Sequence, residues 1–301
     1  MRRFAATLLL LLCCGTASAT ANINILFIYT PSVLAYFGSP AAVDSAVNTA
    51  LSGLNPTGGF NAALASSGVA LTVSKAGIGS TPTEWSVNDW YSPAHDIMIQ
   101  LARDQSKADV VVILTRPLSS GQVTCGYAGG VRGQLPTPQQ AFAMVNAYCM
   151  GVMLTVQHEV GHLLGLHHQA TGGINPDGIL TPYAQGHGLV STTSKTLANG
   201  VTYFSCFYTI MANQFFSCPS VPGYVPDYLN YYSNPNIMTT DTTGGHLIFP
   251  VGNSASPYYA SEFSVLPISG PIVANFHNTS ISTGIAAVLN AIMAGILIGF
   301  D

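Results

Sequence analysis

The sequence predicts an α/β fold, because segments with the pattern of buried strands alternate with segments of helical spacing over its first half. Two runs, 22–29 and 108–115, are rich in apolar and β-branched residues and are followed by turn-forming residues, which is typical of buried strands. A third strand is expected at Ala141–Ala147, directly before a long helical segment over 151–166. Since no linker interrupts this pattern, we expect one domain over residues 20–278.

The remaining elements are predicted from local signals. A serine followed by proline is a good helix start and predicts a helix over 39–54. Alternation of apolar and polar residues indicates a strand over 69–75, and helical spacing indicates a helix over 93–102. Beyond Gly172 the chain is rich in Gly, Pro, Ser, Thr, Asn and Tyr, so we expect loops and only short helices there.

The composition limits the possible functions. Charged residues make up 7% of the 301 residues and apolar residues 48%, whereas about 25% charged residues is ordinary. Such a chain is not a disordered charged tail. With 8 Lys and Arg against 12 Asp and Glu, it also lacks the cations that neutralise phosphates, so no nucleic-acid partner is expected.

The first 19 residues have the pattern of a secretory signal peptide. Arg2 and Arg3 precede the apolar run 4–14, and Ala-Ser-Ala at 17–19 is a suitable cleavage site. We therefore expect a secreted, extracellular protein. Four cysteines follow, and an even number in an exported chain predicts two disulfides. Of the three possible connectivities we favour the one whose two pairs each bracket a short segment, Cys125–Cys149 and Cys206–Cys218.

The final segment, 279–301, is a hydrophobic tail whose apolar run extends over 284–300. Because a bilayer core needs about 20 apolar residues, this run is marginal as a membrane span. Three alternatives stay open for it. It is a helix packed on the domain, a tail that associates with a membrane at the cell surface, or an anchoring signal that is removed.

The residues that carry chemistry are 158–168, His-Glu-Val-Gly-His-Leu-Leu-Gly-Leu-His-His. On a helix His158 and His162 lie one turn apart on one face, so both can bind one metal ion. Glu159 lies beside them and can reach a water on that ion. Gly165 allows a sharp helix exit that returns His168 as a third ligand. Three imidazoles and a water are a catalytic zinc site with one open position.

Two histidines compete for the third position, and their spacing separates them. His168 has the spacing of the longer HExxHxxGxxH pattern, whereas the adjacent His167 is expected at the surface. A downstream glutamate ligand is disfavoured, because the next glutamate after Glu159 is Glu262.

The extended motif resembles that of the metzincin zinc peptidases, and the surrounding sequence is similar to their reprolysin (adamalysin) family, particularly its compact bacterial members. Residues 208–212, Tyr-Thr-Ile-Met-Ala, resemble the methionine turn of that group. The resemblance implies that Met211 lies beneath the metal-binding imidazoles. It also implies a metzincin-like catalytic domain with a twisted mixed sheet, a zinc-binding helix and a loop-rich C-terminal subdomain.

The function expected from the motif is a secreted zinc endopeptidase that acts on protein or peptide substrates. Glu159 is the expected general base and then the general acid. Strand Ala141–Ala147 is the expected edge strand along which an extended peptide would align. Two alternatives are a catalytically silent zinc-dependent binding or adhesion protein on the same scaffold, and a hydrolase of a non-protein amide.

Overall fold

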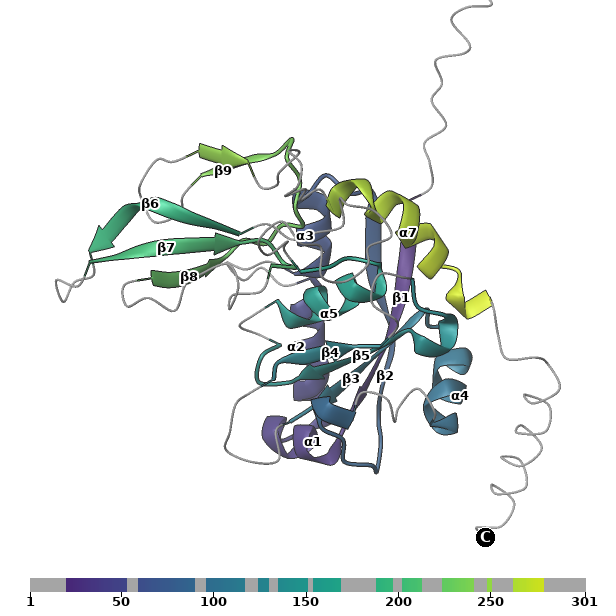
Figure 1. Ribbon diagram of the computed structural model, residues 1–301. Helices are drawn as coiled ribbons and strands as arrows, with labels where there is room; N and C mark the ends of the chain where they lie inside the picture. Colours follow the sequence, from purple (N-terminus) through teal and green to yellow (C-terminus); the bar gives the residue numbers. More distant parts are fainter. Residues whose placement is uncertain are drawn as a thin grey trace, which may run out of the picture.

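The computed structural model describes residues 20–52, 59–89, 96–116, 124–129, 135–150, 154–168, 188–196, 202–212, 224–240, 248–250 and 262–278. Its centre is a five-stranded sheet in the order β2-β1-β3-β5-β4 (Figure 1). Neighbouring strands are parallel except β4, which runs antiparallel to β5. The predicted α/β fold with a mixed sheet is confirmed. The strands are β1 Ala21–Tyr29, β2 Leu71–Ser80, β3 Val110–Thr115, β4 Gly126–Ala128 and β5 Phe142–Asn146.

Helices cover both faces of this sheet. Alternate residues of β1 point to opposite faces, so Ile25 and Phe27 belong to one core cluster and Leu26 and Ile28 to another. Helices α1, α2, α3, α5 and α7 contribute to the first cluster, whereas α4 packs on the second. Their bounds are α1 Pro31–Phe37, α2 Pro40–Ser52, α3 Phe60–Ser66, α4 Ile97–Ser106, α5 Thr155–Leu163 and α7 Leu266–Val273, with short 3-10 turns at Val87–Asp89, Pro138–Gln140, Glu262–Ser264 and Phe276–Asn278.

Side-chain caps explain where two predicted helices begin. The Oγ of Ser39 accepts the backbone N–H of Ala42 at 3.2 Å, and α2 begins at the next residue, Pro40. Helix α4 begins at Ile97, later than predicted, because the carboxylate of Asp96 accepts the N–H of Met98 at 2.9 Å. Each cap satisfies N–H donors of the first helical turn that have no partner within the helix, and so fixes the residue at which the helix begins.

The prediction that Ala141–Ala147 forms the edge strand is wrong. Strand β5 lies between β3 and β4, and all five of its residues are buried. A strand that is apolar on both faces is covered on both sides and belongs inside a sheet. The edge on this side of the sheet is instead the short strand β4, whose three residues are half-buried. Its outer backbone groups are those available to a further strand.

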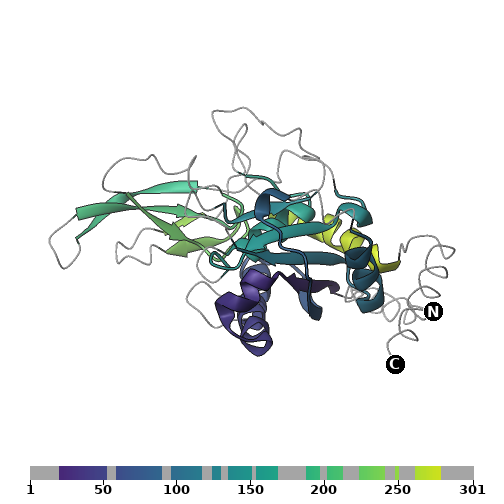
Figure 2. The same cartoon turned by 90° about the horizontal axis from the view of Figure 1, so that it is seen from below.

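The C-terminal part contains strands that were not predicted. Strands β6 Gly188–Thr196, β7 Thr202–Tyr208 and β8 Tyr224–Tyr228 form a second sheet in the order β6-β7-β8. A two-stranded sheet pairs β9 Met238–Thr240 with β10 Ile248–Pro250. The three-stranded sheet extends away from the central sheet in both views (Figures 1 and 2). The second half of the chain is therefore not limited to loops and short helices.

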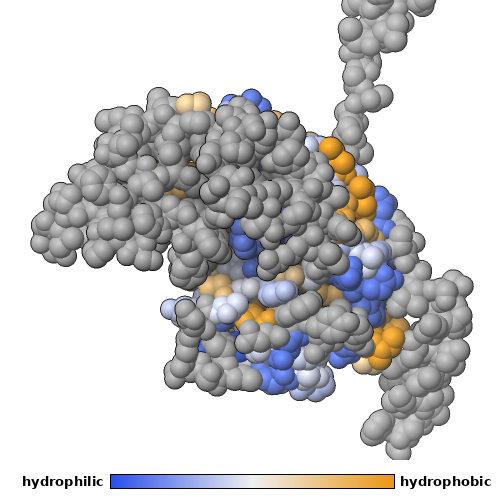
Figure 3. Space-filling model, in the orientation of Figure 1, coloured by the Kyte–Doolittle hydropathy of each residue, from blue (hydrophilic) through white to orange (hydrophobic). Residues whose placement is uncertain are grey.

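The outer side of α7 is apolar. Ile268 and Ile272, one turn apart, are 66% and 48% exposed, and an orange patch lies over this helix in Figure 3. No helix among the described residues is long and apolar enough to cross a membrane. The predicted signal peptide, 1–19, and the hydrophobic tail, 279–301, lie outside the described residues.

A disulfide joins Cys125 and Cys149, one of the two predicted pairs. It ties the start of β4 to the turn that follows β5, and the carbonyl of Cys125 accepts the N–H of Asn146 at 2.8 Å. The side chains of the other predicted pair, Cys206 and Cys218, lie outside the part of the chain whose side chains are described. The edge strand is thus covalently anchored at one end.

Replacing Cys125 and Cys149 together by alanine should lower the free energy of unfolding by about 3 kcal/mol, because the bond closes a 24-residue loop in the unfolded chain. Urea unfolding of parent and double variant measures the loss. Reductant added to the double variant is the control, and a further shift there would report the pair Cys206–Cys218. Equal stability of parent and variant without reductant would contradict the prediction.

Candidate metal centre and catalytic site

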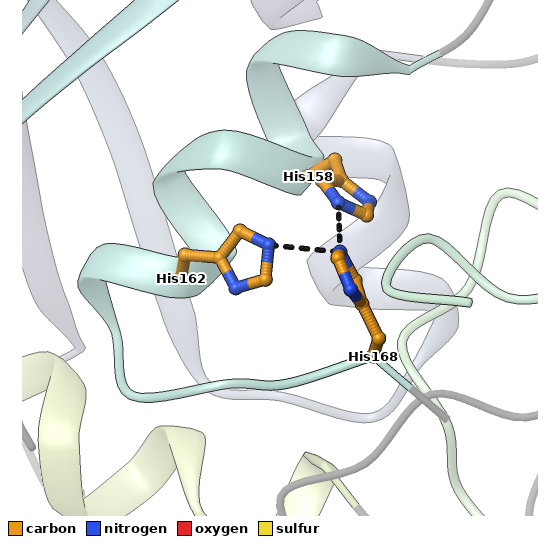
Figure 4. A group of neighbouring side chains, drawn as sticks. All are labelled: His158, His162 and His168. Carbon is orange, nitrogen blue, oxygen red and sulfur yellow. Dashed lines mark hydrogen bonds between the residues drawn. The ribbon is translucent and has the colours of Figure 1, made fainter. Parts of the chain in front are cut away.

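Three imidazole rings meet at one point (Figure 4). The Nε2 of His168 lies 3.0 Å from the Nε2 of His158 and 3.1 Å from the Nε2 of His162. The first two histidines come from α5, and His168 returns to them after the helix has ended. Each residue offers one ligand atom, and these atoms lie within 4.8 Å of one another. The structure therefore brings together the three predicted metal ligands.

Two backbone carbonyls fix the orientation of the helix histidines. The Nδ1–H of His158 donates to the carbonyl of Ile210 at 2.6 Å, and that of His162 donates to Leu166 at 2.8 Å. With the proton held on Nδ1, each Nε2 carries its lone pair and points into the cluster. This arrangement is the usual support of histidines that bind metals.

A glycine turn returns the chain to the helix. Gly165 has φ of +81°, in the left-handed region that favours glycine. The N–H of Leu166 donates to the carbonyl of Gly161, and that of Gly165 donates to His162, both at 3.0 Å. These two bonds are the Schellman pattern of a helix end. The turn directs the chain so that His168 faces His158 and His162.

Met211 packs against helix α5 beside Gly161. It is fully buried, and the turn that holds it is closed by the N–H of Ala212, which donates to Thr209 at 2.9 Å. A Cβ at Gly161 would overlap the Sδ of Met211, so this close approach requires glycine between the two helix histidines. The same turn supplies the carbonyl of Ile210. It therefore both supports the helix and orients His158.

Tyr232 holds the helix at a second point. Its hydroxyl donates to the carbonyl of Gln157 at 2.8 Å, one residue before the first ligand, and its side chain is fully buried. The backbone N–H of Tyr232 donates in turn to Ser67 at 2.8 Å. Sequence reasoning gave this tyrosine and Gly161 no role at the site. In the sequence, Gly161 is visible as a glycine within the helical motif, and Tyr232 as an aromatic residue far along the chain.

Burial shifts the pKa values at the site. Desolvation lowers the pKa of His158 and takes that of His162 well below 6.5, which keeps both rings neutral. The carboxyl of Glu159 is only 6% exposed, and burial raises its pKa to about 8. A bound cation would favour its ionised form. The environment thus leaves Glu159 able to hold or release a proton near neutral pH.

His167 is not at the surface, contrary to the prediction. It is 6% exposed. Successive side chains of an extended segment point to opposite sides, so a chain that turns His168 toward the helix histidines turns His167 the other way. Here that other side is the protein interior. The spacing argument that chose His168 for the cluster agrees with the geometry.

The donor set fits a metal ion. One proton on the Nε2 of His168 cannot lie on the lines to both His158 and His162, and the other two rings hold their protons on Nδ1. Three converging nitrogens with at most one proton among them are a poor hydrogen-bonded cluster. A cation bound by three lone pairs satisfies them all. The site therefore has the composition and geometry of a metal-binding site of the type found in zinc peptidases.

Comparison with known families agrees with this site. Residues 43–169 match the family described as metallo-peptidase family M12B, reprolysin-like, and the match includes all three histidines. Over these residues the chain is similar to the reprolysin-like metallopeptidases. A curated relative from Xanthomonas campestris pv. campestris, named peptidyl-Asp metalloendopeptidase, is 32% identical over 170 residues. Those residues are 56% of this chain and 31% of that protein, so the chain spans about a third of the relative's length.

Solved structures show likeness of fold. A structure entitled "Structure of a chaperone-substrate complex" aligns with 86% of this chain and 39% of its own, with a TM-score of 0.55 and 17% identity. At that identity the likeness concerns the fold alone. Metalloproteinase-II from Bacteroides fragilis aligns over 51% of this chain and 45% of its own, at 19% identity. Its TM-score of 0.31 is too low to support any statement about the fold.

Without metal, the raised pKa of Glu159 should destabilise the protein as the pH rises. Unfolded, the carboxyl ionises near 4.5, whereas folded it keeps its proton to about 8. The unfolded state binds fewer protons across this range, so stability falls with pH. Glu159→Gln should remove this contribution, and the variant should lose less stability than the parent from about pH 5 to 8.

Urea unfolding of chelated protein at the two pH values measures this difference. His158 and His162 also make the free energy of unfolding depend on pH, but they are present in both parent and variant, so their contributions cancel in the comparison. Glu84→Gln, the same chemical change outside the site, is the control. Parallel pH profiles for the parent and Glu159→Gln would contradict the prediction.

Proposed function

We propose that this protein is a zinc endopeptidase. The observation that carries the proposal is the convergence of three imidazole Nε2 atoms at 3.0–3.1 Å, with the buried carboxyl of Glu159 on the same helix. The printed name of the curated relative, a metalloendopeptidase, supports the same activity. A protein or peptide is then the expected substrate.

Zinc is the proposed metal because the ligands are three neutral imidazoles. Zinc–nitrogen bonds of about 2.0–2.1 Å in a tetrahedron place ligand nitrogens about 3.3 Å apart. The separations of 3.0 and 3.1 Å from the Nε2 of His168 to those of His158 and His162 need only a small expansion to reach that value. His158, His162 and His168 would hold one ion and leave one position for water and substrate.

An ion held by His158, His162 and His168 would supply Lewis acidity, which would lower the pKa of a bound water toward about 7 and polarise the scissile carbonyl. Glu159 accepts the proton of the attacking water and later delivers it to the leaving amine. Its burial excludes bulk water from this transfer. Met211 and Tyr232 hold the helix, and therefore the carboxylate, in place.

Strand β4 is the proposed site of peptide alignment. It is the edge of the central sheet, and its residues Gly126–Ala128 pair on one side with β5 only. An extended peptide can add to the outer backbone groups of such a strand. Gly126 also lies against Glu159, so a peptide on β4 passes close to the catalytic carboxylate.

A secreted, extracellular location is proposed on two grounds. The first 19 residues have the composition of a signal peptide. The disulfide between Cys125 and Cys149 is of the kind that forms and persists in oxidising compartments. Association with a membrane through residues 284–300 stays a proposal from the apolar sequence of that tail.

Replacing one ligand should remove the metal. His162→Ala deletes one of the three nitrogens and should reduce zinc content from one equivalent to well below one, with loss of peptidase activity. His167→Asn is the matched control, because it alters the adjacent histidine outside the cluster. Metal content after dialysis, measured by atomic spectroscopy, checks both. One retained equivalent in His162→Ala would refute the assignment.

Glu159→Gln tests the chemistry itself. The amide is nearly isosteric but cannot accept and return a proton, so kcat should fall by about 10²–10⁴-fold or more. KM and zinc content should change little. The assay is hydrolysis of casein or a fluorogenic peptide by zinc-loaded protein, with and without o-phenanthroline.

Glu84→Gln is the matched control and should keep the parent activity. A binding protein would show no chelator-sensitive hydrolysis, and a hydrolase of another amide would leave peptides intact. Turnover of Glu159→Gln within a few-fold of the parent would overturn the role of Glu159.

A further inference from the structure

We infer that Gly126 is a positioning residue for Glu159, because its missing side chain provides the space in which the carboxyl group lies. A Cβ at Gly126 would lie 2.5 Å from the Cγ and 2.6 Å from the Cδ of Glu159, closer than such atoms approach in proteins. It would also overlap Oε1. The inference rests on the proposed function, in which this carboxyl group moves the proton.

The backbone of β4 cannot move away to relieve such a contact. Cys125, directly before Gly126, is bonded to Cys149, and its carbonyl accepts the N–H of Asn146 at 2.8 Å. Gly126 itself pairs with Val145 on β5. At the other end of the strand, the N–H of Gly129 donates to Phe142 at 2.6 Å.

The helix that carries Glu159 is held as firmly. Tyr232 donates to the carbonyl of Gln157, and Met211 fills the space beside Gly161. The overlap includes Cγ as well as the carboxyl end, so a rotation of the terminal torsion alone does not remove it. A methyl group at position 126 must therefore displace the Glu159 side chain from its present place.

Strand β4 therefore has two proposed roles. Its outer backbone groups face the position proposed for the peptide, and its first residue limits where the carboxyl group can lie. Because Cys149 also lies between β5 and α5, the disulfide joins the strand to the segment that leads into the catalytic helix. The disulfide and the contact of Gly126 with Glu159 therefore both involve the start of the strand proposed to align the peptide.

The first experiment is the kinetics of Gly126→Ala. Displacing a catalytic group by about 1 Å can cost about 10²-fold in rate, so kcat should fall by that order. KM and zinc content should change less than threefold, because the ligands and the strand's backbone bonds remain. Gly79→Ala is the matched control, since Gly79 is also a strand glycine but has no atom within 4 Å of an added Cβ. It should keep the parent kcat.

The second experiment measures the contact without reference to activity. In a double-mutant cycle, Gly126→Ala should lower the Tm of the metal-free parent clearly but have little effect in the Glu159→Ala background, where the side chain it meets is gone. If Gly126→Ala alone does not fold, recovery of folding in the double variant gives the same answer. Equal losses of Tm in both backgrounds would overturn the inference.

The two experiments separate the possible failures. A parent with no peptidase activity would refute the proposed function, while the Tm cycle still decides whether Gly126 makes room for Glu159. An active parent whose Gly126→Ala variant keeps its kcat would refute the positioning role. An equal fall in the kcat of the Gly126→Ala variant and of the Gly79→Ala control would also refute it, because the loss would then follow from replacing any strand glycine by alanine.

Discussion

The convergence of three imidazole nitrogens is the constraint on which the site depends. The Nε2 atoms of His158 and His162 lie 3.0 and 3.1 Å from that of His168, and the three cannot all satisfy one another by hydrogen bonds, whereas a shared cation would satisfy all three lone pairs. Burial lowers the pKa of His158 and His162 and so keeps these two rings neutral, and the carbonyls of Ile210 and Leu166 fix their orientation. These carbonyls belong to different segments, which must therefore fold correctly before the metal can bind.

Close packing around α5 keeps the metal-binding nitrogens of His158 and His162 in position. A helix can present ligands accurately only if it cannot slide or rotate, and glycines allow its neighbours to approach the backbone. Gly161 admits Met211, and Gly126 admits the side chain of Glu159. The disulfide from Cys125 prevents the edge strand from yielding. Burial then does two opposite things: it keeps the histidines ready for a cation and holds Glu159 protonated until a cation is present.

Local pattern was sufficient for the parts of the site that are close in sequence. The three histidines, the glutamate and the helix exit at Gly165 all lie within eleven residues, and helix geometry alone places them. Strands β1 and β3 were equally clear, because a buried parallel strand is a continuous apolar run. The C-terminal strands were missed because Ser, Thr and Gly suggested loops, although Thr, Tyr and Phe in β7 also favour strands.

What the sequence could not supply is the placement of segments relative to one another. Whether a strand lies at an edge depends on its neighbours, so Ala141–Ala147 was assigned to the edge that β4 occupies. A three-residue strand such as β4 is too short to show any period. The continuous apolar run Phe-Ala-Met-Val at 142–145 was the available sequence signal, since a strand that is apolar on both faces needs neighbours on both sides. The close approach of Gly126 to Glu159 follows only once that order of strands is known, because it joins residues from an edge strand and a helix that share no local pattern.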